Sequence, residues 1–183
     1  YKNEFDIYRK EKKAHPLMQK HNLNCIPYDH EKLPEWRNAF KGIQWHDKET
    51  NFLLFGGIDD VWINTDDELH IVDYKATAKK TFNPNFDTGW EVCYKRQIEI
   101  YQWLFRKNGF KVSDIGYIIY ANGKSDEKEF NKNLSFEEYL FPLACNTDWV
   151  DEIIKEIYQC LNSEKLPKSG GGWNGEGLSL IHI

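Results

Sequence analysis

Two carboxylates and one ammonium come close together in the sequence, at Asp59, Asp73 and Lys75. They lie in or beside two short runs, 52–63 and 69–74, that are rich in apolar, aromatic and β-branched residues, and such runs predict β-strands. The polar stretch between the runs has the length of a hairpin connection. If this hairpin pairs Asp59 with the region of Asp73, the three charged groups meet on one face of a sheet.

Alternation along the strands supports that arrangement. Successive side chains of a strand point to opposite faces of the sheet. Asp73 and Lys75 are therefore predicted to point to one side, and Tyr74 to the other. On the first strand, Asp59 and Asp60 likewise fall on opposite faces. Charges on a largely apolar face are rarely buried without a partner.

This charged cluster has two interpretations. One is a salt bridge between Lys75 and either carboxylate that serves packing alone, although desolvation offsets most of the attraction in such a bridge. The second carboxylate would also leave the cluster with a net negative charge. A bound Mg²⁺ or Mn²⁺ would balance that charge, because hard cations take oxygen ligands. We therefore favour a divalent-metal site of the kind that acts on phosphodiesters.

A predicted helix over residues 91–107 carries two further candidates. It ends at Asn108-Gly109, a typical C-terminal stop. Gln97 and Tyr101 are one turn apart, so their side chains share a face of this helix. Taken alone, Tyr101 would be a core residue with Gln97 at its border. In the context of the charged cluster, we favour a place for both residues in the site.

These residues form three motifs in order along the chain: Gly56-x-Ile58-Asp59, Asp73-x-Lys75 and Gln97-x-x-x-Tyr101. Together they resemble the PD-(D/E)XK nuclease superfamily. The third motif resembles that of its RecB-like branch, which includes the RecB and AddB helicase–nucleases and the CRISPR-associated exonucleases. The resemblance extends from about Asn51 to Gly123.

The resemblance implies roles for the residues on the two strands. Asp59 would be a bridging metal ligand and Asp73 the second carboxylate ligand, for Mg²⁺ or Mn²⁺. The backbone carbonyl of Tyr74 would complete part of the metal shell. Lys75 would orient or deprotonate the attacking water and offset charge on the phosphate.

The resemblance also implies roles outside the strands. Gln97 and Tyr101 would lie beside the metal and position the lysine or the nucleic-acid backbone. The RecB-like branch often places a His or Glu ligand on a helix before the core. Glu4 is the candidate for that ligand in this chain, and a residue before Tyr1 is the alternative.

The implied function is a Mg²⁺- or Mn²⁺-dependent deoxyribonuclease, of exonuclease type, that hydrolyses DNA phosphodiester bonds in repair, recombination or defence. Its partners would be DNA, as a single strand or a duplex end, and a helicase or other DNA-processing protein. Two alternatives stay open. One is a catalytically inactive DNA-binding or scaffold module on the same fold, and the other is a metal-dependent hydrolase with another substrate.

The expected fold class is α/β. The element order is helix, strands, helix, strand, helix, which is typical of a sandwich with a mixed central sheet. The resemblance implies the same architecture, a restriction-endonuclease-like core with a mixed central β-sheet flanked by helices. The remaining expected elements are a first helix ending at His15-Pro16, an irregular stretch over 25–40 with a short helix at about 35–40, strands over 115–120 and near 134–136, and a last helix from Asp148.

Composition sets further bounds. The 183 residues correspond to one domain. We expect residues 1–166 to form a single nuclease-like domain that is truncated at its N-terminus, and 167–183 to be a Gly-rich tail, disordered or artefactual. The net charge of −5 argues against an extended, nonspecific DNA-binding surface. A nuclease whose basic groups line one groove remains compatible with it.

The four cysteines have no C-x-x-C spacing, so neither a zinc signature nor a dense disulfide framework is present. No signal peptide is visible and no apolar run approaches a membrane span. We therefore expect a cytoplasmic protein with no membrane partner. RecB-like relatives often hold an iron–sulfur cluster on one cysteine before the core and three after it. This chain lacks that pattern, so a cluster is expected only in a longer protein.

Overall fold

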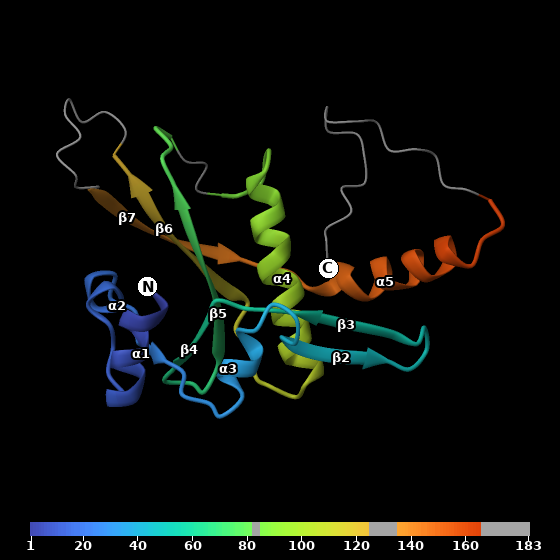
Figure 1. Ribbon diagram of the computed structural model, residues 1–183, viewed down its shortest axis with the longest axis horizontal. Helices are drawn as coiled ribbons and strands as arrows, with labels where there is room; N and C mark the ends of the chain where they lie inside the picture. Colours follow the sequence, from blue (N-terminus) through green and yellow to red (C-terminus); the bar gives the residue numbers. More distant parts are fainter. Residues whose placement is uncertain (82–84, 125–134, 166–183) are drawn as a thin grey trace.

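A five-stranded mixed sheet with the order β1-β4-β5-β6-β7 forms the centre of the protein, and helices flank it (Figure 1). The computed structural model describes residues 1–81, 85–124 and 135–165. The strands of this sheet are β1 (Cys25–Pro27), β4 (Asp60–Asn64), β5 (Leu69–Thr77), β6 (Ile115–Gly123) and β7 (Phe136–Ala144). Two more strands, β2 (Ile43–Asp47) and β3 (Phe52–Gly56), form a separate two-stranded sheet. The helices are α1 (Lys2–Glu11), α2 (Pro16–Lys20), α3 (Leu33–Trp36), α4 (Glu91–Lys107) and α5 (Asp148–Leu161).

The pairing of the central strands is mixed. β4 and β5 form an antiparallel hairpin, and β6 pairs antiparallel with β7. Between them, β5 and β6 run parallel. Parallel neighbours need a long crossover connection, and α4 lies in that connection. The crossover brings the α4 helix back across the strand that carries Asp73 and Lys75.

Apolar side chains on the two faces of the sheet form two separate cores. On one face, Ile71 and Ile118 pack with Ile98 of α4. On the other face, Val72 and Ile119 belong to a second cluster that includes residues of α1 and α2. In Figure 1, α1 and α2 lie on the opposite side of the sheet from α4. Adjacent residues of β5 therefore serve different cores, as the alternation in the sequence predicts.

Several sequence predictions are confirmed. The mixed sheet flanked by helices is the expected fold, and α4 has the predicted bounds. A turn closes the hairpin between β4 and β5, where the amide of Asn64 donates to the carbonyl of Glu68 at 3.1 Å. The predicted strand over 115–120 lies within β6, and the last helix begins at Asp148.

The expectation of one continuous strand over 52–63 is wrong. β3 and β4 belong to different sheets, and residues 57–59 connect them. The amide of Ile58 donates to the carbonyl of Trp36 at 3.0 Å, and the Ile58 side chain is buried. The contact between Ile58 and Trp36 holds the connection at the point where the chain leaves one sheet and enters the other. A local hydrophobic pattern does not reveal such a long-range contact.

The N-terminal region also differs from expectation. The first helix ends at Glu11, after which Lys12 adopts the left-handed conformation with φ of 52°. Pro16 begins α2 rather than ending α1, as suits a residue that favours the first turn of a helix. The stretch 25–40 contains β1 as well as a helix, α3, that ends at Trp36, and the strand β2 follows where none was predicted.

Some expectations fall outside the described residues. The tail over 167–183 and its boundary at 166 lie there, as does Leu134 of the expected strand near 134–136, whereas Phe136 begins β7. None of the helices in the described ranges is both long enough and apolar enough to cross a membrane.

Candidate functional site

The connection between β3 and β4 places Asp59. The register pairs Asp60 with Val72, so Asp59 lies beside Asp73 at the next position. Its Oδ2 accepts a hydrogen bond from the amide of Tyr74 at 2.9 Å, and its Oδ1 lies 2.8 Å from the Nζ of Lys2. Asp59 therefore reaches across to β5 from a position just outside the regular ladder.

Asp73 is the buried carboxylate of the pair, with 4% of its surface exposed. Its Oδ2 lies 2.6 Å from the Nζ of Lys75. Burial raises the pKa of Asp73 to about 6; the charge of Lys75 opposes the rise, and the neighbouring carboxylate of Asp59 adds to it. The site thus pairs a buried carboxylate with a second carboxylate and one ammonium, and both burial and the second acid disfavour the ionised form of Asp73.

A polar chain connects these strands to α4. Lys75 donates to the Oε1 of Gln97 at 3.1 Å, and the Nε2 of Gln97 donates to the hydroxyl of Tyr101 at 3.0 Å. The ammonium of Lys75 also lies 4.5 Å from the ring centroid of Tyr94. Burial raises the pKa of Tyr101, so its hydroxyl remains protonated at neutral pH. The structure therefore brings the predicted residues Asp59, Asp73, Lys75, Gln97 and Tyr101 into one connected group.

Gly56 allows α4 to approach this closely. A Cβ atom at position 56 would lie 2.5 Å from Cε1 of Tyr101. Any larger residue would displace the Tyr101 ring and, with it, the hydroxyl that contacts Gln97. The close approach of Tyr101, in the third motif, therefore explains why the first motif has a glycine at position 56.

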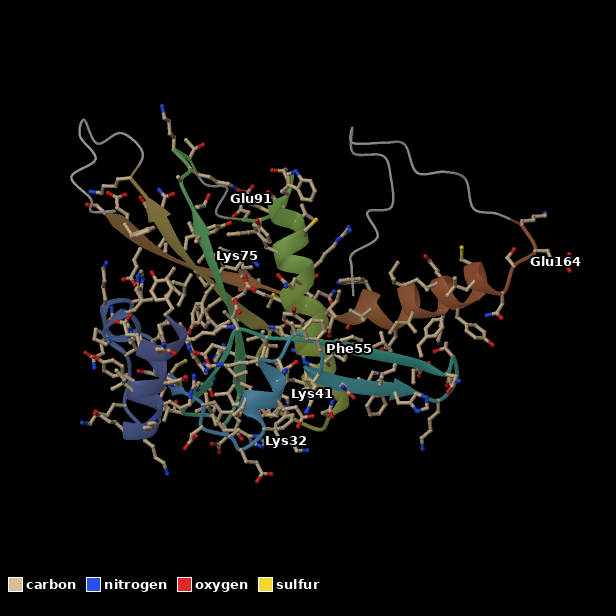
Figure 2. The ribbon with its side chains drawn as sticks, in the orientation of Figure 1. Lys32, Lys41, Phe55, Lys75, Glu91 and Glu164 are labelled. Atoms are coloured by element: carbon tan, nitrogen blue, oxygen red, sulfur yellow. The ribbon has the colours of Figure 1, made fainter. Side chains whose placement is uncertain are left out.

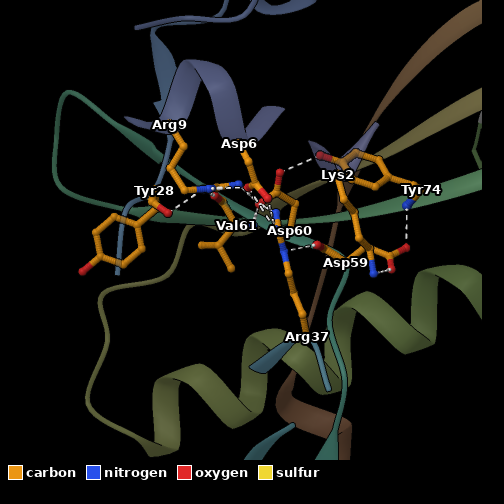
Figure 3. Close-up of polar contacts among 9 residues, drawn as sticks. All are labelled: Lys2, Asp6, Arg9, Tyr28, Arg37, Asp59, Asp60, Val61 and Tyr74. Carbon is orange, nitrogen blue, oxygen red and sulfur yellow. Dashed lines mark hydrogen bonds and ion pairs between the residues drawn. The ribbon is translucent and has the colours of Figure 1, made fainter. Parts of the chain in front are cut away.

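A second charged network on the opposite face was missed by sequence reasoning (Figure 3). Asp60 is fully buried and accepts from Arg9, from Arg37 and from the hydroxyl of Tyr74, the last at 2.6 Å. Arg37 also donates from Nε to the carbonyl of Asp59 at 2.9 Å. Through Arg37, this network holds the backbone of Asp59 from the face of the sheet opposite to Asp73. The predicted opposite orientation of Asp60 was a signal that it needed a cation, but no sequence spacing identifies Arg9 or Arg37.

Glu4 is not brought into this group. Its side chain is 57% exposed, and its Oε1 lies 3.1 Å from Nε2 of His15. Across residues 1–81, 85–124 and 135–165, no three His, Cys, Asp or Glu side chains gather closely enough to form a metal-binding group. The carboxylates available at the candidate site are therefore Asp59 and Asp73.

These two carboxylates still fit a hard divalent cation. Mg²⁺ is commonly held by one or two carboxylates, with waters and substrate phosphates as its other ligands. Burial and, to a smaller extent, the neighbouring Asp59 carboxylate raise the pKa of Asp73, and a bound cation would favour its ionised form. The ammonium of Lys2 lies 2.8 Å from Oδ1 of Asp59, one of the carboxylate oxygens that could bind a cation.

Comparison with known families agrees with this geometry. A family model described as the PD-(D/E)XK nuclease superfamily matches residues 6–168. The chain therefore belongs to the PD-(D/E)XK nuclease superfamily, and its central sheet is the restriction-endonuclease-like core of that superfamily. Comparisons with curated proteins and with solved structures gave no match. Nucleases of this superfamily generally use divalent metals such as Mg²⁺.

Proposed function

We propose that this protein is a Mg²⁺- or Mn²⁺-dependent nuclease that hydrolyses phosphodiester bonds of DNA. One observation carries the proposal: Asp59, from the connection before β4, lies beside Asp73 and Lys75 of β5. Membership of the nuclease superfamily supports hydrolysis of nucleic acid as the reaction of this group of residues.

In this proposal Asp59 and Asp73 would hold the metal through carboxylate oxygens, together with the backbone carbonyl of Tyr74. The bound cation would lower the pKa of a water molecule and offset negative charge on the phosphate. Lys75 would orient or deprotonate the attacking water and offset charge on the scissile phosphate. Its ammonium is kept in place by Asp73 and Gln97, which contact it at 2.6 and 3.1 Å.

We further propose that the protein is an exonuclease of the RecB-like branch, acting in DNA repair, recombination or defence beside a helicase or another DNA-processing protein. The support is the third motif. Gln97 contacts both Lys75 and Tyr101, so the two residues of that motif are connected to the lysine through Gln97. Gln97 and Tyr101 are one turn apart on α4, the helix in the crossover between β5 and β6.

Cleavage of labelled single- and double-stranded DNA in Mg²⁺ and in Mn²⁺ tests this function. Lys75→Ala should lower the rate by roughly 10²- to 10⁴-fold, the contribution typical of a positioned acid–base group. Lys111→Ala is the matched control, because Lys111 is exposed and pairs with Glu68 at the surface. Equal rates for the two variants would contradict the proposed role of Lys75.

A second candidate is a catalytically inactive DNA-binding module, and one observation favours it. Each carboxylate of the site already has a lysine partner, Lys2 on Asp59 and Lys75 on Asp73. Calorimetric titration with Mn²⁺ separates the two candidates. A nuclease should bind the metal, and more tightly in Lys2→Ala, whereas an inactive module would bind DNA without binding metal or cleaving.

A further inference from the structure

A cavity of about 530 Å³ opens beside the candidate site. Its volume falls within the range of roughly 300–1,000 Å³ that is typical of ligand pockets. The cavity is lined by both strand and helix residues, among them Phe55, Gly56, Trp90, Tyr94, Gln97 and Tyr101. Figure 2 labels Phe55 on β3 and Lys75 on β5, two strands that supply the cavity and the site.

Four of the ten residues that line this cavity are aromatic. Phe55 comes from β3, and Tyr94 and Tyr101 come from α4. Trp90 stands at the N-terminal end of α4 and is 71% exposed. Because Trp90 both lines the cavity and is exposed, the apolar face of its indole ring is available to a flat ligand in the cavity.

The cavity is continuous with the candidate site. Gln97 and Tyr101 line it and also belong to the polar chain from Lys75. Tyr94 lines it as well, and its ring lies 4.5 Å from the lysine ammonium. A group seated in the cavity would therefore lie next to the phosphate that Lys75 faces.

We propose that this cavity holds an unpaired nucleobase next to the scissile phosphate, so that the enzyme acts on single strands in preference to intact duplex. The inference rests on the proposed nuclease function. Aromatic side chains stack on any base, because every base has a π-face. A paired base is unavailable, since it must first leave its stack at a cost.

The charge of the protein points the same way. With 29 acidic and 24 basic residues, its net charge is −5. Binding of intact duplex without base contacts depends mainly on phosphate neutralisation by Lys and Arg. A protein of this charge gains less from that source, and stacking in the cavity would supply affinity that does not depend on a basic surface.

Binding without cleavage provides the test. Fluorescence anisotropy in EDTA would compare wild-type protein with three labelled probes: a short oligothymidylate, a strand of the same length made of abasic residues, and a blunt duplex of that length. We expect the oligothymidylate to bind at least about tenfold more tightly than either other probe, as loss of one or more base stacks implies. Equal affinity for the oligothymidylate and the abasic strand would overturn the proposal without any mutation.

Variants locate the effect. Trp90→Ala should weaken oligothymidylate binding by roughly 5- to 100-fold, and Trp90→Phe should retain most of it. Both should leave the abasic strand unaffected. Phe136→Ala is the control, because Phe136 is 55% exposed and does not line the cavity. An equal loss on all three probes, or no loss on any, would overturn the assignment.

The two proposals fail in different ways. If wild-type protein discriminates between the probes in EDTA but cleaves none of them in Mg²⁺ or Mn²⁺, the base-binding cavity stands and the nuclease function falls. If the protein cleaves single strand and duplex alike and binds the abasic strand as tightly as the oligothymidylate, the nuclease function stands and the cavity assignment falls.

Discussion

Lys75 carries three N–H donors on its ammonium, and two of them have partners among the described residues, Asp73 and Gln97. Both partners are acceptors, so they hold the ammonium in a fixed direction while its charge remains. Asp73 fixes the lysine from its own strand, and Gln97 fixes it from α4. At the scale of single residues, the orientation of the Lys75 ammonium therefore depends in part on Gln97 of α4.

Removing the helix partner should reveal that dependence. We expect Gln97→Ala to lower the cleavage rate by roughly 10- to 100-fold, because a hydrogen bond to a charged group contributes about 1.5–3 kcal/mol. Gln44→Ala is a suitable control, since Gln44 is exposed and its side chain donates to the carbonyl of Lys41, away from the candidate site. Cleavage at the wild-type rate in Gln97→Ala would refute the positioning role.

Metal binding should depend on the buried carboxylate. Mn²⁺ at 100 times its Kd should stabilise the wild-type protein by about 2.7 kcal/mol, seen as a rise in Tm. Asp73→Asn should lose that rise because the amide is a poor ligand for a hard cation. Asp66→Asn, in the exposed turn between β4 and β5, should keep it. An identical rise in Asp73→Asn would place the metal elsewhere.

At the scale of elements, the strand connection before β4 is held from both sides. The amide of Tyr74 in β5 contacts the Asp59 carboxylate, and Arg37, just after α3, contacts the Asp59 carbonyl. Arg37 also bonds to both carboxylate oxygens of Asp6 in α1, at 2.9 and 2.8 Å. Three elements that do not follow one another in the chain thus converge on one catalytic candidate.

Loss of this arginine should destabilise the fold. Arg37→Ala should cost about 2–3 kcal/mol in urea unfolding, somewhat less than a fully broken buried ion pair, because Asp60 keeps Arg9 as a partner. Lys13→Ala removes an exposed ion pair with Glu11 and should cost less than about 1 kcal/mol. Equal costs for the two variants would mean that the buried network contributes nothing beyond a surface pair.

The contact between β5 and β6 predicts a pH effect. The Nδ1 of His70 lies 2.8 Å from the carbonyl of Ile115, and its Nε2 lies 3.3 Å from the Nδ2 of Asn64. A neutral ring that donates from Nδ1 and accepts at Nε2 satisfies both contacts, whereas protonation would break the second. Burial lowers the pKa of His70, so the unfolded chain binds its proton more tightly than the folded one does.

The free energy of unfolding should therefore fall as pH drops through about 6.5, the unfolded pKa of His70. His70→Gln should remove this component between pH 7 and 5. Comparing the variant with wild type cancels the titration of carboxyls that both proteins share. His46→Gln is the control because His46 is exposed and contacts Asn51. A wild-type slope in His70→Gln would contradict the assignment.

At the scale of the whole molecule, local patterns predicted much of the structure. Helix α4 has the bounds that its periodicity indicated, and the alternation in β5 correctly separated Asp73 from Tyr74. The meeting of Asp59 with Asp73 also followed from local information, because a short hairpin determines it. These features depend on residues that are near one another in the sequence.

The features that could not be predicted depend on distant partners. The chain leaves β3 and enters another sheet because Ile58 bonds to Trp36, and a hydrophobic run carries no trace of that contact. Likewise, Lys2 and Arg9 reach β4 and its preceding connection from α1. Ion pairs of such long sequence separation have no characteristic spacing, so a single sequence does not reveal them.

The parallel pairing of β5 with β6 has a consequence during synthesis. β5 ends at Thr77, whereas β6 begins only at Ile115, so a nascent chain leaving the ribosome presents β5 as an open edge until the later strand emerges. Open apolar edges invite association between copies, and charged side chains on an edge oppose it. Asp73 and Lys75 sit in the middle of the apolar strand at that stage. We therefore expect the residues proposed for cleavage also to act as gatekeepers against aggregation of the unfinished chain.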